Sequence, residues 1–274
     1  MALHGFLRGY REYPDTQALG AALRALVEEG LDQLPLPGSG QTLERFSRLA
    51  QVAGHDLRLC KLYEGHTDAL AIIAELGSPL PPVGSTWGMW GGEAPTPPGE
   101  KHPARPPVWL QGRKAWCSGA AVVSHGLLTA WDEEDRQQLV AVEMHQPGVT
   151  VTDEGWQAVG MAATGSVEVL FSEASGLAIG EPGDYLARPG FWQGGVGIAA
   201  CWYGAAQRLS EALREQCAKR AEPHALAHLG SVDSALHSAA CVLRECATHI
   251  DRHPKANAQL LAQQARDCFF DTGP

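Results

Sequence analysis

The chain of 274 residues is 45% hydrophobic and 19% charged, which is typical of a globular protein long enough to bury a sizeable core. Its formal net charge of −10 argues against nucleic acid or an anionic membrane surface as the main partner, because such surfaces repel an acidic protein. No apolar run approaches the roughly 20 residues that a spanning helix needs, so no transmembrane segment is expected.

The N-terminal residues and the cysteines indicate a reducing compartment. The first residues, MALHGFLRGYREYP, lack the layout of a signal peptide. The seven cysteines are odd in number and widely spaced, and no two of them form a CxxC pair. This pattern is typical of free thiols rather than of a disulfide framework or a structural zinc site. We therefore expect a cytoplasmic protein.

Helical periodicity dominates the chain to about residue 83. After Pro14 and Asp15, positions on one face recur every three or four residues, at Leu19, Leu23, Leu26, Gly30 and Leu34. The prolines and glycines of LPLPGSG (34–40) end this helix. A second helix is expected from about Thr42, with Leu43, Phe46, Leu49 and Ala53 aligned on one face. A third is expected around 68–75, with Gly77 as its C-cap.

The segment 78–107 is rich in proline and glycine. We expect a linker or a functional loop there, because so many prolines cannot fill a central strand. Its large side chains, Trp87, Met89 and Trp90, are unusual for a linker.

Short strands are predicted from Val108 to about Ala187, where the hydrophobic period changes to two. The runs VWL, AAVVSHGLLTAW, QLVAVEMH, VTVT and VEVLF are separated by turn residues. Their number and length favour a compact sandwich or barrel.

Helical periodicity returns from Gly190. The first predicted helix places Ile198, Trp202, Ala205, Leu209 and Leu213 on one face. The second repeats apolar residues every 3.5 positions, as helix bundles do, at Leu229, Val232, Leu236, Ala239, Leu243, Cys246 and Ile250. A shorter helical segment, KANAQLLAQQARDCFF, follows.

The order of helices, strands and helices predicts an α+β protein with segregated layers rather than alternating βαβ units. We expect an N-terminal helical domain (1–83), a middle β domain (84–188) and a C-terminal helical bundle (189–274).

Several common site motifs are missing or incomplete. A GxGxxG fingerprint and a GxxxxGK[ST] phosphate loop are absent from the sequence. GGVGIAA (194–200) opens a predicted helix and so could hold an anion, although such glycines more often allow a tight helix entry.

Two histidine patterns also fail as catalytic motifs. His224 and His228 have the spacing of zinc ligands but lack the HExxH glutamate, so surface or interhelical histidines are expected. Ser124 and His125 are adjacent on a predicted strand, where neighbours point to opposite faces and cannot hydrogen-bond. The GxSxG elbow is absent too, which argues against a serine hydrolase.

Two tryptophan-containing stretches, TWGMWGGEAP (86–95) and RKAWCSGA (113–120), have the ingredients of a flavin site. A flavin needs a ring to stack on, small residues at its edge and donors aimed at its heteroatoms. The alternative is that these tryptophans are core residues of a small β domain.

In their order and spacing, several stretches resemble motifs of the acyl-CoA dehydrogenase family. LYEGHTDALAIIAELG (62–77) is similar to the helix before the middle domain of that family, and GMWGGEAP (88–95) to its flavin-contacting loop. GRKAWCSGA (112–120) is similar to its Lys-x-Trp-Ile-Thr-Asn-Gly stretch. EGWQAVGMAATGSVEVLF (154–171) resembles the strand that closes the β domain, and FWQGGVGIAACWYGAAQRLSEAL (191–213) resembles the first long bundle helix.

The resemblance implies a helical domain, a small β-barrel domain and a helical bundle that together bind FAD. Trp116 would pack on the isoalloxazine, Ser118 would hydrogen-bond near its reactive nitrogen, and the loop 90–93 would approach its pyrimidine side. The implied cofactor-binding residues are Trp90, Gly91, Gly92, Glu93, Trp116, Cys117 and Ser118.

The chain also departs from the family pattern. Gly92-Glu93-Ala94 replaces Thr-Glu-Pro, and Ala163 stands where an arginine is expected. The sequence ends after the third predicted bundle helix, whereas the family carries its catalytic glutamate further on. The alternative glutamate position, early in the first bundle helix, is occupied by Gln193, Gly194 and Gly195. The sequence thus offers no candidate general base.

Two functions remain open from the sequence. One is an atypical FAD-dependent oxidoreductase that acts on an acyl thioester such as acyl-CoA, assembled as a homodimer or larger homo-oligomer through the bundle. The alternative is a non-catalytic homologue that serves as a binding or scaffold protein. A flavoprotein with changed chemistry is a third possibility.

Overall fold

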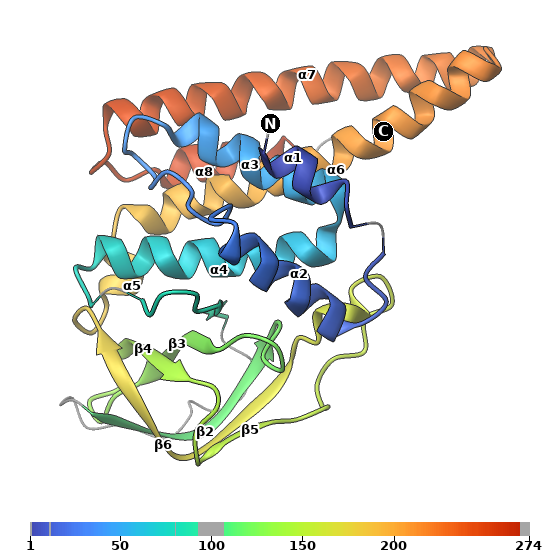
Figure 1. Cartoon of the computed structure of the whole chain (residues 1–274). Coiled ribbons are helices and arrows are strands. Elements are labelled where there is room, and N and C mark those ends of the chain that lie inside the picture. Colours follow the sequence, from blue (N-terminus) through green and yellow to red (C-terminus); the bar gives the residue numbers. More distant parts are fainter. Residues whose placement is uncertain (1, 11, 80, 93–106, 269–274) are drawn as a thin grey trace.

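The computed structural model describes residues 2–10, 12–79, 81–92 and 107–268. Helices precede a β domain and long helices follow it, which confirms the predicted α+β organisation (Figure 1). The N-terminal helices are α1 (Ala2–Leu7), α2 (Thr16–Glu28), α3 (Thr42–His55) and α4 (Leu57–Glu75). The strands are β1 (Trp87–Trp90), β2 (Val108–Cys117), β3 (His125–Trp131), β4 (Gln137–Glu143), β5 (Val149–Val151) and β6 (Val167–Ile179). The later helices are α5 (Asp184–Ala187), α6 (Gly190–Lys219), α7 (Pro223–Arg252) and α8 (Gln259–Asp267).

Helix α2 is shorter than its apolar pattern predicts. Its N-cap, Asp15, accepts a hydrogen bond from the Ala18 N–H at 2.8 Å. The helix ends because Gly30 takes a left-handed φ of 65° and the Leu31 N–H closes back on the Leu26 carbonyl. Gly30 and Leu34, which the pattern places on the helix face, therefore lie beyond its end.

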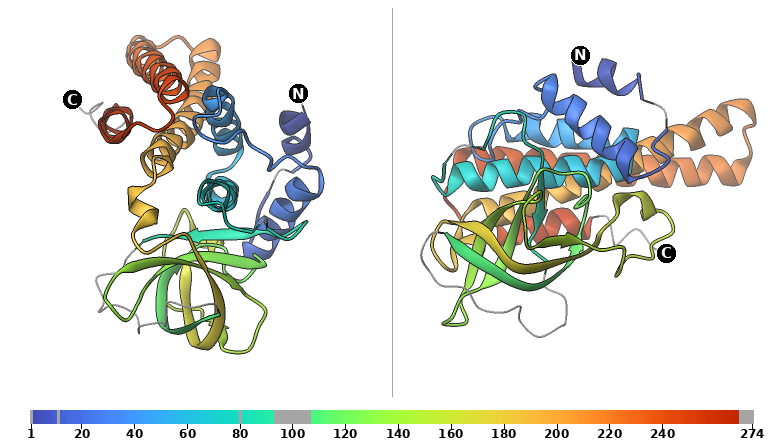
Figure 2. Two further views of the ribbon diagram at one scale, coloured as in Figure 1. Left: turned by 90° about the vertical axis from the view of Figure 1, so that its left-hand side faces the viewer. Right: turned by 60° about the horizontal axis from the view of Figure 1, so that its bottom comes forward.

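Helix α4 is longer than predicted and lies at the centre of the molecule. It begins at Leu57, where the Asp56 carboxylate caps the first turn. Its C-cap is Leu76, and Gly77, the predicted cap, follows directly with a left-handed φ of 66° that ends the helix. Figure 2 (left) shows α4 end-on, between the β domain and the other helices. Its buried residues contact α2, α3 and β1, so α4 joins the layers.

A six-stranded sheet forms the β domain, in the order β1-β3-β4-β6-β2, with β5 also paired to β6. The long strand β6 pairs with β2 and β5 over its first part and with β4 over its last residues. The tryptophan-containing part of the predicted linker or loop, Trp87–Trp90, is strand β1, which pairs in parallel with β3. Residues 93–106 of that segment lie outside the described residues.

A buried histidine fastens β1 to α4. The backbone N–H of Trp87 donates to Nδ1 of His66 at 3.1 Å, so this nitrogen is unprotonated. Nε2 of His66 then carries the proton and faces Asp32 Oδ2 at 3.2 Å. One imidazole therefore links α4, the strand and the segment after α2.

The bundle helices α6 and α7, of 30 residues each, form a hairpin whose tip projects beyond the body (Figure 1). The predicted apolar face of α6 is wrong, since Leu209 is 73% exposed, while Gly197 and Gly204 are buried. Small residues replace large ones there because α6 crosses α3 in backbone contact: a Cβ at Gly204 would collide with the Ala50 carbonyl. GGVGIAA lies inside α6 rather than at its start, so its N–H groups are used within the helix.

In α7 the predicted apolar face is buried only in the second half, from Ala239 to Ile250. In the described part of the chain, no helix is both long and apolar enough to span a bilayer.

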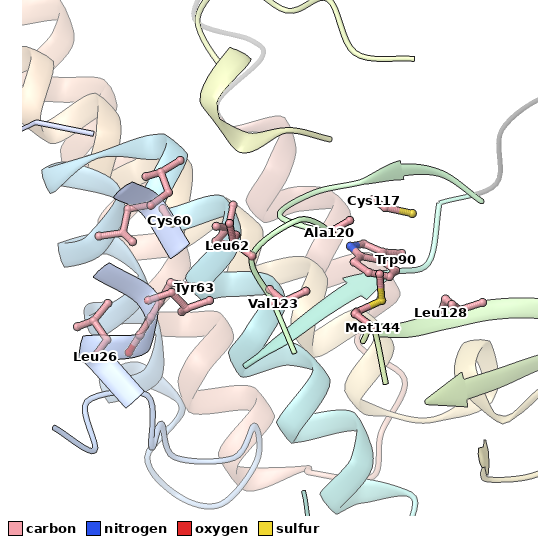
Figure 3. Close-up of a cluster of buried hydrophobic side chains, with 14 of the residues drawn as sticks. Leu26, Cys60, Leu62, Tyr63, Trp90, Cys117, Ala120, Val123, Leu128 and Met144 are labelled. Atoms are coloured by element: carbon pink, nitrogen blue, oxygen red, sulfur yellow. The ribbon is translucent and has the colours of Figure 1, made fainter. Parts of the chain in front are cut away.

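The largest hydrophobic cluster runs from the N-terminal helices into the β domain. It includes Leu26, Cys60, Leu62 and Tyr63 from the helices and Val123, Leu128 and Met144 from the β domain (Figure 3). This core crosses the predicted boundary at residue 83, so α4 and the β domain stabilise each other.

Candidate functional site

Trp116 occupies a bulge at the end of β2. Lys114 pairs with Val169 and Cys117 with Val167, so Ala115 and Trp116 together face one residue of β6. Trp116 has a φ of 58°, a left-handed conformation that costs a bulky residue roughly 1–2 kcal/mol. Its side chain is 47% exposed. The bulge thus holds a large flat ring at the surface rather than in the core.

The end of β1 passes beside this ring. A Cβ at Gly92 would lie 3.4 Å from Cε3 of Trp116. On the other side, a Cβ at Gly91 would collide with the hydroxyl of Tyr185, which comes from α5. The Tyr185 hydroxyl thus occupies the place that a side chain would take at Gly91, and the Trp116 ring lies in contact distance of the backbone at Gly92. Glu93, the fourth residue of the predicted loop, lies outside the described residues.

Trp90 and Cys117 face the core. Trp90 is 2% exposed, its Nε1–H donates to the Ser118 carbonyl at 3.1 Å, and its ring fills the space above Gly88 and Gly126 (Figure 3). Burial raises the pKa of the Cys117 thiol to about 12, so it stays protonated. Neither side chain presents a surface to a ligand, and the Trp90 bond instead fixes the turn that carries Ser118.

Ser118 belongs to a chain of buried hydroxyl groups. Its Oγ lies 2.7 Å from Ser166 Oγ, which lies 2.9 Å from Thr164 Oγ1. Thr164 gives its proton to the Met161 carbonyl, so Ser166 donates to Thr164 and Ser118 donates to Ser166. The Ser118 oxygen is therefore left as an acceptor toward any further group.

Helix α4 borders the same region. The turn after β2 rests on it, because a Cβ at Gly119 would lie 3.0 Å from Cγ of Leu62. Glu64 and Asp68 follow along α4, four residues apart and so on one face. A Cβ at Gly194, near the start of α6, would lie 3.4 Å from Oδ1 of Asp68. The ends of β1 and β2, with α4, α5 and the first turns of α6, thus meet at one place, which is the candidate site.

Glu64 and Tyr185 bind their protons more tightly than such groups usually do. Burial raises the pKa of the Glu64 carboxyl to about 7; nearby Asp68 raises it further, while Lys61 and Arg45 lower it. Burial also raises the pKa of Tyr185 to about 12. Sequence reasoning missed Glu64, Asp68 and Tyr185, although two acids four apart in the apolar helix LYEGHTDALAII were a usable signal.

The residues at the alternative glutamate position, 193–195, supply no carboxylate to the candidate site. Gln193 is buried, and its Nε2 donates to the Pro254 carbonyl at 2.9 Å, toward the bundle. The next residue, Gly194, lies beside Asp68.

One expectation about Ser124 and His125 is wrong. Ser124 Oγ and His125 Nδ1 lie 2.8 Å apart, because Ser124 precedes β3 and is not bound by strand alternation. The Ser124 hydroxyl also bonds both the N–H and the carbonyl of Thr86, and the His125 ring stacks on Trp87 with centroids 4.7 Å apart. These contacts hold β1 against β3 and leave no free nucleophile.

The bundle histidines are at the surface. His224 and His228 are both exposed. Within the described ranges, no group of three or more His, Cys, Asp or Glu side chains could hold a metal ion.

No protein-family model and no curated protein sequence matches the chain. Solved structures do match. Butyryl-CoA dehydrogenase from Megasphaera elsdenii superposes with a TM-score of 0.77 at 14% identity, over 98% of this chain and 82% of that one. The chain has the acyl-CoA dehydrogenase-like fold. The same fold is seen in two further structures.

TdsC from Paenibacillus sp. A11-2, solved with FMN and indole, has a TM-score of 0.75 at 19% identity, over 97% of this chain and 80% of that one. Methanesulfinate monooxygenase MsuC from Pseudomonas fluorescens has a TM-score of 0.73 at 18% identity, over 90% and 74%. At these identities the likeness concerns the acyl-CoA dehydrogenase-like fold, which confirms the fold predicted from the sequence.

Proposed function

We propose that the chain is a flavin-dependent oxidoreductase. The observation that carries this proposal is the Trp116 ring, held half exposed in a strained bulge beside Gly92. A residue kept against its conformational preference is typical of functional positions. A flat conjugated ring would cover the half-exposed indole, so Trp116 fits a flavin.

Each residue of the candidate site has a definite task in this proposal. Trp116 supplies the stacking face, and Gly92 brings backbone without a side chain beside that ring. Ser118 accepts a hydrogen bond, while Trp90 and Cys117 hold the turn from inside. The flavin, when bound, supplies the electron transfer that protein side chains do not offer.

The finer points of the proposal come from the resemblance and from the solved relatives. The resemblance suggests FAD, an acyl thioester such as acyl-CoA as substrate, and a cytoplasmic homo-oligomer with domains 1–83, 84–188 and 189–274. The TdsC structure holds FMN, so both flavins enter the test. The rival, a non-catalytic binding protein, is supported by Gln193, which offers no carboxylate and faces the bundle.

The visible absorption spectrum of the purified protein, alone and titrated with FAD and with FMN, tests the proposal. We expect a flavin band shifted from that of the free cofactor, and quenching of flavin fluorescence by Trp116. If neither flavin binds at millimolar concentration, the oxidoreductase is excluded and the non-catalytic binding protein remains.

A further inference from the structure

A hollow of about 850 Å³ lies where α3 crosses the middle of α6, and such a volume is typical of small-molecule pockets, which span roughly 300–1,000 Å³. Its walls come from three places: α1 with the residues that follow it, the later turns of α3, and the middle of α6. This space, here called the α3–α6 hollow, shares no residue with the candidate site around Trp116.

The floor of the α3–α6 hollow is backbone. A Cβ at Gly54 would lie 3.0 Å from the carbonyl oxygen of Gly204, and a Cβ at Gly204 would collide with Ala50. All three residues line the hollow, so nothing larger than the methyl group of Ala50 rises from the helix crossing. Because the floor is bare, the longer side chains on both sides enclose an open space rather than fill it.

The wall formed by α1 is held in place. Leu7, the last residue of α1, is 3% exposed and belongs to the largest hydrophobic cluster. Beyond it, Tyr10 stacks on Tyr13 with ring centroids 6.3 Å apart, and the Tyr13 hydroxyl lies 2.9 Å from Nε2 of His55 on α3. These contacts fix the segment that carries Arg8 along the edge of the hollow.

Two arginines line the α3–α6 hollow from different walls, Arg8 beside α1 and Arg208 on α6. Among the described residues, Arg8 has no side-chain hydrogen bond or ion pair. Arg208 pairs at 3.2 Å with Glu211, the one carboxylate of the lining, and a solvent-exposed pair of this kind is worth little. Burial lowers the pKa of His55, so this imidazole is neutral near pH 7. The lining is thus positive on a chain whose net charge is −10.

The remaining walls present neutral hydrogen-bonding groups. Ser47 and Gln51 lie one turn apart on α3, and Tyr203 and Gln207 lie one turn apart on α6. Within the described ranges, none of these four side chains forms a hydrogen bond to another protein group. Hydroxyl and amide groups both donate and accept hydrogen bonds, as the hydroxyl groups of a sugar do. The walls therefore match a ligand that is rich in hydroxyl groups.

We propose that the α3–α6 hollow binds a sugar phosphate, either free or as part of a nucleotide. A phosphate ester carries about two negative charges at neutral pH, and the planar fork of an arginine matches its oxygens. Arg8 has no competing partner among the described residues, and Arg208 supplies a second fork from the opposite element. The sugar hydroxyls would bind the four neutral side chains. An anion with an apolar body matches less well, because it would leave those groups unpaired.

Calorimetric titration of the purified chain tests the inference with two matched pairs of probes: ribose 5-phosphate against ribose, and AMP against adenosine. Inorganic phosphate is the probe for charge alone. We expect at least one phosphate ester to bind tenfold or more tightly than its neutral partner and than inorganic phosphate. Arg8→Gln and Arg208→Gln should each weaken this binding by about tenfold, because each removes a hydrogen bond between charged groups. Arg220→Gln, which removes the same charge from an exposed position after α6, should leave the affinity unchanged.

Ser47→Trp is a second test that does not depend on charge. Ser47 is exposed on α3, so the variant should fold, and its large ring would occupy the hollow and abolish binding of the phosphate ester. Circular dichroism of each variant establishes that it is folded. A preference for AMP over ribose 5-phosphate would support the inference with a nucleotide as the source, and the reverse preference would support it with a free sugar phosphate.

The inference is overturned if no phosphate ester binds at millimolar concentration, or if inorganic phosphate binds as tightly as the esters. Normal binding in both arginine variants and in Ser47→Trp would also overturn it. Trp116→Gly should bind the ester as the unmodified chain does, because Trp116 does not line the hollow. Loss of binding in Trp116→Gly would place the phosphate at the candidate site instead and overturn the inference. Failure to bind a flavin counts against the oxidoreductase alone and leaves the α3–α6 hollow untouched.

Discussion

At the scale of single residues, both the backbone conformation and the exposure of Trp116 are unfavourable for stability. Its left-handed φ favours glycine, and a ring that is 47% exposed recovers little free energy from burial. The indole therefore contributes little to folding, in contrast to Trp90, whose ring is enclosed and hydrogen-bonded.

Replacing Trp116 with glycine should separate stability from binding. We expect Trp116→Gly to leave the free energy of unfolding unchanged or to raise it by about 1 kcal/mol, because the strain at φ is relieved. Flavin affinity should fall tenfold or more, since aromatic stacking is worth about 1–3 kcal/mol. Trp116→Phe should retain most of the affinity. Urea unfolding and flavin fluorescence titration measure the two effects, and a strongly destabilised glycine variant that binds flavin normally would contradict this account.

Glu64 predicts a pH dependence of stability. Its pKa in the folded protein, about 7, lies above its ordinary value of 4.5, so the folded state binds this proton more tightly than the unfolded chain. The free energy of unfolding should therefore fall as the pH rises from 4.5 to 7, and the loss should be complete above 7. Glu64→Gln removes this loss and should stabilise the protein at pH 8 by on the order of 1–3 kcal/mol relative to its effect at pH 4.5.

Urea unfolding of both proteins at pH 4.5 and pH 8 checks this prediction. Glu28→Gln, at an exposed site on α2, is the matched control and should have the same small effect at both pH values. An equal effect of Glu64→Gln at the two pH values would mean that the carboxyl titrates normally.

At the scale of elements, the crossing of α6 and α3 depends on glycine. A Cβ at Gly54 would lie 3.0 Å from the Gly204 carbonyl oxygen, and a Cβ at Gly204 would collide with Ala50. The two helices thus approach until their backbones touch, and any side chain at the crossing must push them apart.

Gly204→Ala should destabilise the protein by roughly 1–3 kcal/mol, because overpacking of a close contact forces the backbone to shift. Gly230→Ala is the matched control on α7, where nothing lies within 4 Å of the added Cβ. This control should stabilise by up to about 1 kcal/mol through helix propensity. Thermal unfolding monitored by circular dichroism compares the two, and opposite signs are the expected result.

The same crossing shows what the sequence could and could not predict. The helix stop at Gly77, the change from helical to β period and the family motifs predicted the fold, because each signal is local. The buried face of α6 was missed because Gly197 and Gly204 carry no hydrophobic signal. Strand β1 was missed because proline and glycine surround it.

The site was predictable in part for a similar reason. The sequence singled out Trp116 as a large ring next to small residues, and the structure places it at the surface beside Gly92. The sequence did not separate Trp116 from Trp90, because exposure depends on strands that meet only in the folded chain. Glu64 and Asp68 acquire their neighbours from α5 and α6 only in the folded chain, so the sequence did not single them out.

At the scale of the whole molecule, one core serves both the helices and the β domain. His66 links α4 to β1, and the largest cluster contains residues from both parts. The candidate site lies where β1, β2, α4, α5 and α6 meet, so its geometry depends on the assembled chain rather than on any one domain. Substitutions in the shared core should therefore alter the geometry of the candidate site and also lower the free energy of unfolding.

The projecting hairpin of α6 and α7 is the part of the described chain best suited to the proposed homo-oligomer. Leu209 is 73% exposed and Leu226 is 45% exposed, one on each helix of the hairpin. The hairpin formed by these two helices projects beyond the body at its tip (Figure 1). Apolar side chains on a projecting pair of helices are typical of surfaces that pack against a second copy.

Sedimentation velocity tests this contact. We expect a dimer or larger assembly of the unmodified chain, and a shift to monomer in the double variant Leu209→Glu, Leu226→Glu, because the charges would be buried without partners. Val159→Glu is the matched control, since Val159 is 98% exposed and lies between β5 and β6 in the chain, outside the hairpin helices. A double variant with an unchanged sedimentation coefficient would exclude the hairpin as the contact. If the unmodified chain is a monomer, the homo-oligomer is excluded. The candidate site would then consist of residues from one copy alone.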